Sequence, residues 1–249
     1  MEHKELRRPV AGAKTALLFI HGLIGTPNHF DILWDRVPED MTVYKLLLDG
    51  HGKAPLDFGR TSIRVWERQV REAVDELAQT HENILLVGHS MGTLFAMTES
   101  LRCEKIKGLF LIAIPITPWP GVRMITNGFK MYFNLVRPED IYTNAAVRCY
   151  GIGDDKNPFH YYRWPLRYFD LFGKVAETRK LLHRVTVNCT AYQSAQDEMV
   201  SRRSIPYLRK HAAFPVRVLE KSGHCYYDPQ ELTYLKDEFS NFIKENAPK

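Results

Sequence analysis

The stretch from residue 84 to residue 94 limits most strongly what this chain can fold into. It reads Ile-Leu-Leu-Val-Gly-His-Ser-Met-Gly-Thr-Leu. The apolar run predicts a buried strand, and the segment from Thr93 to Leu101 predicts a helix, so a Gly-x-Ser-x-Gly pattern occupies the turn between them. Glycines at 88 and 92 suit such a turn because side chains there would collide with the neighbouring strand or helix. The turn would lift the Ser90 hydroxyl above the sheet, beside the free N–H groups of a helix N-terminus.

The rest of the chain alternates between apolar runs and amphipathic segments. The clearest helix is 62–80, where apolar residues recur at steps of three and four. Strands are predicted at 15–21, 42–48, 83–87, 108–114, 185–192 and 216–219, and further helices at 30–37, 201–211 and 230–245. This alternation implies crossover connections between the strands. It therefore predicts a mostly parallel sheet with helices on both faces. The fold class is therefore α/β.

Residues 115–183 interrupt this alternation. They are rich in proline, arginine and aromatic residues and are too long for an ordinary connection. We expect a core domain formed by residues 1–114 and 184–249, with 115–183 as a mostly helical cap inserted after a strand. Such an insertion lies over the crevice in which open α/β sheets bind ligands, so a lid is the functional interpretation. An extra packing layer without a selective role is the alternative.

Three side chains with complementary chemistry follow predicted strands. Ser90, Asp197 and His224 each come just after a strand's carboxyl end, and parallel strands bring those ends to one edge of the sheet. A serine hydroxyl needs a base to become a nucleophile, and the base needs an orienting carboxylate. We predict Ser90 as nucleophile, His224 as base and Asp197 as acid. Rival acids are the adjacent Glu198 and, more remotely, Asp154, Asp155 and Asp228.

An oxyanion formed at Ser90 would need two backbone N–H donors. We expect one from Met91, directly after the serine, and one from Leu23, in the glycine-rich loop after the first long strand. The histidines at 21, 51 and 89 lie in turns and are too dispersed for a metal set, so we interpret them as structural.

Composition excludes several classes of protein. The net charge of +5 is dispersed and forms no dense basic run, which disfavours nucleic-acid binding. No apolar run is long enough to cross a bilayer, so we expect no stable membrane insertion. The polar N-terminus has no signal-peptide core, which predicts a cytoplasmic protein. The four cysteines lack Cys-x-x-Cys spacing and are expected to be reduced thiols, not a disulfide frame or a zinc site. The oligomeric state stays open.

Five motifs together resemble α/β-hydrolase serine esterases, most closely the bacterial carboxylesterase and monoacylglycerol lipase group. They are Phe19–Leu23, Leu48–Gly52, Gly88–Gly92, Asp197–Val200 and Ser222–His224. The resemblance covers nearly the whole chain except residues 115–183. It implies an α/β-hydrolase fold with catalytic Ser90, Asp197 and His224 and oxyanion amides at Leu23 and Met91. It specifies the substrate poorly, because many chemistries share this fold and triad.

The leading hypothesis is hydrolysis of carboxylic esters with short to medium, apolar acyl groups through an acyl-serine. The same triad also serves cleavage of thioesters, amides or carbon–carbon bonds, and acyl transfer to an alcohol where water is excluded. A non-catalytic ligand-binding protein of this fold is a hypothesis of another class. We expect no metal or organic cofactor, because the triad needs none.

Overall fold

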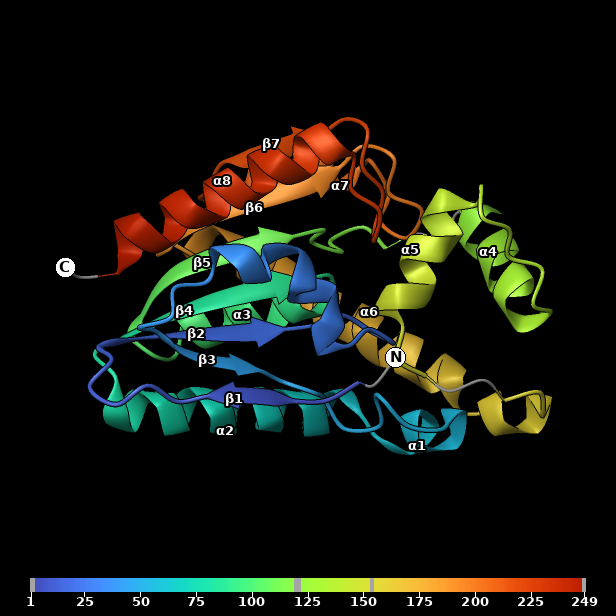
Figure 1. The fold of residues 1–249 in the computed structure, drawn as a ribbon, viewed down its shortest axis with the longest axis horizontal. Coiled ribbons are helices and arrows are strands. Elements are labelled where there is room, and N and C mark those ends of the chain that lie inside the picture. Colours follow the sequence, from blue (N-terminus) through green and yellow to red (C-terminus); the bar gives the residue numbers. More distant parts are fainter. Residues whose placement is uncertain (1–2, 119–121, 153–154, 248–249) are drawn as a thin grey trace.

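The computed structural model describes residues 3–118, 122–152 and 155–247. Within these residues, seven strands form one sheet in the order β1-β3-β2-β4-β5-β6-β7 (Figure 1). The strands are β1 (Leu6–Arg8), β2 (Thr15–Ile20), β3 (Thr42–Lys45), β4 (Asn83–His89), β5 (Ile106–Ile112), β6 (Asn188–Ser194) and β7 (Val216–Leu219). β1 pairs antiparallel with β3, and the other pairings are parallel. The predicted mostly parallel sheet is confirmed.

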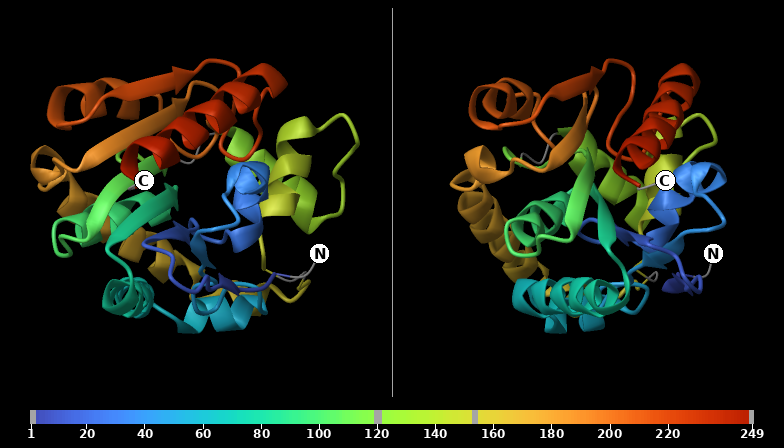
Figure 2. Two further views of the ribbon diagram at one scale, coloured as in Figure 1. Left: turned by 60° about the vertical axis from the view of Figure 1, so that its left-hand side comes forward. Right: turned by 90° about the vertical axis from the view of Figure 1, so that its left-hand side faces the viewer.

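Helices cover both faces of the sheet (Figure 2). On one face, η1 (Pro27–Arg36, a 3-10 helix) and α8 (Pro229–Asn246) pack Phe30 and Phe239 against Phe19 of β2. On the other face lie α2 (Ile63–Thr80), α3 (Met91–Ser100) and α7 (Ser204–His211). Successive residues of β2 and β4 belong alternately to the two hydrophobic clusters, because side chains of a strand alternate between its faces. This explains why the central residues of both strands are apolar without a break.

The sequence patterns missed two short elements. β1 is an exposed edge strand of three residues, and α1 (Pro55–Arg60) occupies part of the connection after β3. Neither has a run long enough to produce a recognisable period. The long helix predicted at 62–80 begins at Ile63, after Ser62, whose hydroxyl oxygen accepts a hydrogen bond from the Val65 N–H.

The region 115–183 contains α4 (Val122–Tyr132), α5 (Ile141–Cys149), η2 (Pro158–Tyr161), α6 (Trp164–Arg179) and η3 (Leu182–Arg184). Helices α4 and α5 lie beyond the carboxyl ends of the central strands (Figure 1). Helix α6 is different, because its Leu171 and Val175 are buried in the core cluster together with α2 and α3. The region thus has an outer part over the sheet edge and an inner helix that completes the core.

No helix in the described part of the chain is both long and apolar enough to cross a membrane.

Candidate active site

The turn between β4 and α3 holds Ser90 in a strained backbone conformation, with φ of 51° and ψ of −122°. Its flanking glycines are needed for space. A Cβ atom at Gly88 would lie 2.8 Å from the Cα of Thr93, and one at Gly92 would overlap the carbonyl oxygen of Ile20. The crowding predicted for these positions is therefore present, against the helix at one glycine and against β2 at the other.

Hydrogen bonds and a neighbouring loop fix Ser90 in place. Its N–H donates to the Ile112 carbonyl at 2.9 Å, and its carbonyl accepts from the Thr93 hydroxyl at 2.6 Å. The loop after β2 passes so close that a Cβ at Gly22 would lie 2.8 Å from the Ser90 Cβ. Among the residues that the structure describes, none forms a hydrogen bond with the Ser90 hydroxyl. The serine is thus held by its backbone, with its side chain uncommitted.

His224 and Asp197 form a buried pair. Nδ1 of His224 lies 2.9 Å from Oδ2 and 3.1 Å from Oδ1 of Asp197. The side chains are 3% and 1% exposed, respectively. Oδ1 of Asp197 also accepts the N–H groups of Met199 and Val200, each at 2.8 Å, which holds the carboxylate toward the ring. Burial disfavours the imidazolium, but the charge and hydrogen bond of Asp197 outweigh it and raise the pKa of His224 above its usual value.

The other candidate acids have different partners. Oε2 of Glu198 accepts the backbone N–H of His224 at 3.0 Å, so Glu198 supports the histidine's main chain and not its ring. Burial raises the pKa of Glu198, and its Oε1 is buried without a hydrogen-bond partner. Asp228 accepts the N–H of Gln230 and caps α8, and Asp155 contacts His160. Asp154 lies outside the described residues. Of the described candidates, only Asp197 bonds the His224 ring.

The loops that carry Leu23 and Met91 meet at the serine. Met91 is the first residue of α3, and the first N–H groups of a helix have no partner within it. Leu23 follows Gly22, in a turn closed by the Gly25 N–H on the Gly22 carbonyl at 3.1 Å. The structure therefore places both backbone segments beside Ser90, one after β2 and the other after β4.

The three histidines at 21, 51 and 89 are buried and hold loops together. Nε2 of His21 accepts the N–H of Leu48 at 3.0 Å, and burial keeps the pKa of His21 well below its usual value. Burial likewise lowers the pKa of His51 to about 4. Nε2 of His89 donates to the carbonyl of His224 at 3.0 Å. His89 thus ties the turn that bears Ser90 to the loop that bears His224, a contact that its position in the sequence did not indicate.

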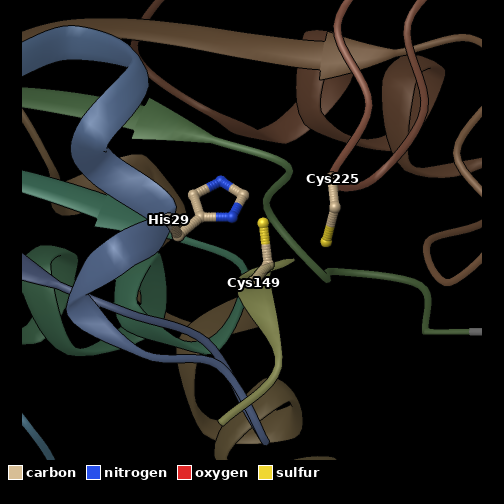
Figure 3. A group of neighbouring side chains, drawn as sticks. All are labelled: His29, Cys149 and Cys225. Atoms are coloured by element: carbon tan, nitrogen blue, oxygen red, sulfur yellow. The ribbon is translucent and has the colours of Figure 1, made fainter. Parts of the chain in front are cut away.

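A group of possible metal ligands lies beside this site and was missed by sequence analysis. His29 of η1, Cys149 at the end of α5 and Cys225 after His224 converge so that one nitrogen and two sulfur atoms lie within 4.8 Å of one another (Figure 3). Cys103 and Cys189 lie outside this group, and none of the four cysteines is paired in a disulfide in the structure. However, no sequence spacing could have revealed this group, because its members come from three distant segments.

A cavity of about 240 Å³ lies between the outer helices and the core. Its apolar walls include Met131 of α4, Ala146 of α5, and Trp164 and Tyr168 of α6. It also reaches Ile24, next to Leu23, and the two residues that follow Asp197 in the chain. The described residues that line it do not include Ser90, so the cavity borders the predicted catalytic residues and does not enclose them.

Known proteins of similar sequence and structure include lipases. A match of 26% identity over 144 residues, 55% of this chain, is to the sn-1-specific diacylglycerol lipase ABHD11 of Danio rerio. The match spans 43% of that relative's length. A structure from the metagenome-derived lipolytic enzymes LipS and LipT has a TM-score of 0.72 at 18% identity and covers 98% of both chains. The Paleococcus ferrophilus monoacylglycerol lipase also has a TM-score of 0.72, at 14% identity, covering 99% of this chain and 100% of its own.

At such low identities the solved structures establish the shared fold alone. A comparison with family models establishes more than the fold. The model of the alpha/beta hydrolase family matches residues 17–233, from β2 into α8. This range includes the turn at Ser90 and the Asp197–His224 pair. With this match, and with the sheet order and strand-to-helix turn described above, the chain belongs to the alpha/beta hydrolase family.

Proposed function

We propose that this protein is a serine hydrolase that cleaves carboxylic esters through an acyl-Ser90 intermediate. The observation that carries the proposal is the pairing of two features at one edge of the sheet. Ser90 stands on a strained turn with a positive φ of 51°, and the buried His224–Asp197 pair lies next to that turn through the His89 contact. This combination supplies a nucleophile together with an oriented base.

In this mechanism His224 takes the proton of the Ser90 hydroxyl as the oxygen attacks the ester carbonyl, and later gives it to the leaving alcohol. Asp197 keeps the Nδ1 proton on the ring, which leaves Nε2 free to act as base, and stabilises the imidazolium. The Ser90 hydroxyl has to turn toward the ring for the first step. Catalytic hydrogen bonds are often long without substrate and tighten when it binds.

The oxyanion is stabilised by the N–H groups of Leu23 and Met91. The close approach of Gly22 to Ser90 supports this assignment. It puts the loop that carries Leu23 next to the serine that would attack the carbonyl group of the ester. Removing one such donor typically costs about 100- to 1000-fold in rate, so their geometry matters as much as that of the base. The donors belong to the main chain, and no side-chain chemistry is required at either position.

Residues 115–183 act as the cap, and the cavity beneath their outer helices takes the apolar acyl group. Its aromatic and aliphatic walls, including Met131, Trp164 and Tyr168, suit a short to medium chain. The similarity to lipolytic enzymes supports an ester with an apolar acyl group as the small-molecule substrate.

A panel of nitrophenyl esters of increasing chain length tests the proposal. We expect turnover that a Ser90→Ala variant lacks, and labelling of Ser90 by a fluorophosphonate, which reacts quickly only with an activated serine. Turnover of no ester above the Ser90→Ala level would contradict it. Faster cleavage of a matched thioester, amide or diketone, by about a thousandfold, would keep the nucleophile and change the substrate class.

A further inference from the structure

The group formed by His29, Cys149 and Cys225 takes no part in ester hydrolysis as described above. We propose that these three side chains form a binding site for a thiophilic divalent cation, Zn²⁺ above all. One imidazole nitrogen and two thiol sulfur atoms lie within 4.8 Å of one another, from three separate segments of the fold (Figure 3). Imidazole and thiolate are the donors that zinc prefers in proteins.

The spacing of these ligand atoms is close to what a tetrahedral site needs. With Zn–S bonds of about 2.3 Å and Zn–N bonds of about 2.0 Å, the ligand atoms of such a site are about 3.5–3.8 Å apart. The observed group must therefore contract by at most about 1.3 Å, which rotation of two cysteine side chains can supply. Three protein ligands leave the fourth position for water or another small ligand.

The backbone around Cys149 is anchored, so the site does not have to be assembled from a mobile segment. The Gly151 N–H donates to the Ile24 carbonyl at 3.2 Å, and the Thr26 hydroxyl donates to the Cys149 carbonyl at 3.4 Å. These bonds attach the end of α5 to the loop that precedes η1, the element that carries His29. The first two ligands thus belong to segments that already pack together.

The backbone around Cys225 is held as firmly. Nε2 of His89 donates to the carbonyl of His224, and the Gly223 N–H donates to the Tyr226 carbonyl at 2.8 Å. On the other side, Nε2 of His29 lies 3.3 Å from the hydroxyl of Tyr227, which restrains the orientation of that ring. Outer contacts of this kind orient metal ligands in known sites.

The burial of these three side chains also suits a divalent cation such as Zn²⁺. His29 and Cys225 are buried, and Cys149 is half-buried, which leaves a way in for an ion. Two thiolates and a neutral imidazole around Zn²⁺ have no net charge, so the complex avoids the large cost of burying an unpaired ion. A disulfide between the two cysteines would need an external oxidant and would leave His29 without a role.

Metal at this position would link α5 to the loop that carries His224, because Cys149 and Cys225 belong to those two segments. If the proposed esterase activity holds, zinc should slow ester hydrolysis, and a chelator should restore it. The binding site itself does not depend on that activity, so the primary test measures binding.

The test uses full-length protein without a polyhistidine tag, reduced and stripped of metal with a chelator that is then removed. Titration with Co²⁺ should give thiolate-to-cobalt charge-transfer absorption that saturates at one ion per chain and is abolished by one equivalent of Zn²⁺. Cys149→Ser should weaken Zn²⁺ binding at least tenfold, because losing even an outer partner that orients a ligand typically costs about 10- to 100-fold. Cys103→Ser, which removes a half-buried thiol outside the group, is the matched control and should bind like the wild type.

His29→Gln provides a second variant with both thiols intact, in case Cys149→Ser folds poorly, and should also weaken binding at least tenfold. The proposal is overturned if the reduced wild type shows no thiolate-to-cobalt absorption. It is equally overturned if folded Cys149→Ser and His29→Gln, judged by circular dichroism, bind zinc as tightly as Cys103→Ser. Failure of esterase activity with intact cobalt binding would remove the proposed function and leave this site standing.

Discussion

The turn at Ser90 and the region 115–183 differ in how closely the chain is packed. Around the serine, the main chain packs so closely that Gly22, Gly88 and Gly92 have no room for a methyl group. In the region 115–183, by contrast, a Cβ atom added at Gly128 or Gly173 would meet nothing within 4 Å, and Phe129 and Phe159 are 61% and 79% exposed. The comparison indicates that close backbone packing fixes the conformation at Ser90, whereas the region 115–183 leaves room for side chains to change.

The largest effect should come from the nucleophile. Ser90→Ala should lower kcat for a nitrophenyl ester by roughly 10⁴-fold or more while the protein stays folded, since only the reacting oxygen is removed. Steady-state kinetics and thermal unfolding, measured side by side, check this. Residual activity within tenfold of the wild type would mean that the turn is a structural feature and not the reactive one.

The next effect distinguishes the two adjacent acids. Asp197→Asn should lower kcat by roughly 100- to 10,000-fold, because the amide no longer stabilises the imidazolium of His224. Glu198→Gln should cost less, because its Oε2 bonds only the backbone N–H of His224 and an amide oxygen can accept the same bond. Measuring kcat of both variants on one ester tests which carboxylate orients His224. An equal or larger loss in Glu198→Gln would reverse the assignment.

A pair of glycine substitutions tests the difference in packing itself. Gly92→Ala should destabilise the protein by at least about 3 kcal/mol, because its Cβ would overlap the Ile20 carbonyl oxygen. Gly173→Ala, in the interior of α6 with open space around it, should stabilise it by roughly 0.5–1 kcal/mol. Urea unfolding of both variants gives the free energies of unfolding. Similar free energies of unfolding for the two variants would show that the chain near the serine can accommodate a methyl group with little loss of stability.

The smallest effect concerns chain length. Ala146→Leu fills part of the cavity under the outer helices, so kcat/KM should fall about tenfold for a medium-chain ester and little for an acetate ester. The acetate ester serves as the internal control in the same preparation. A uniform loss across the panel would indicate that the substitution disturbs α5, and that the cavity does not receive the acyl group.

Local patterns were sufficient for most of the fold. Alternating apolar runs and amphipathic segments located β2, β4, β5, β7, α2 and α8 to within a few residues. The 3-10 geometry of η1, the edge strand β1 and the integration of α6 into the core were not predictable, because each depends on neighbours that are distant in the chain. The region 115–183 is mostly helical, as its sequence suggested, but the split between the outer α4 and α5 and the buried α6 could not be read from the sequence.

By itself, the amino-acid sequence determined the order of the main strands and helices of the core and the place of Ser90 on a strand-to-helix turn. It could do so because residue periodicity and paired glycines are local signals. Only the tertiary structure decided that Asp197, and not its neighbour Glu198, bonds the His224 ring. It alone brought His29, Cys149 and Cys225 together. The physical reason is the same in both cases: side chains meet through the relative placement of separate loops, which no spacing along the chain encodes.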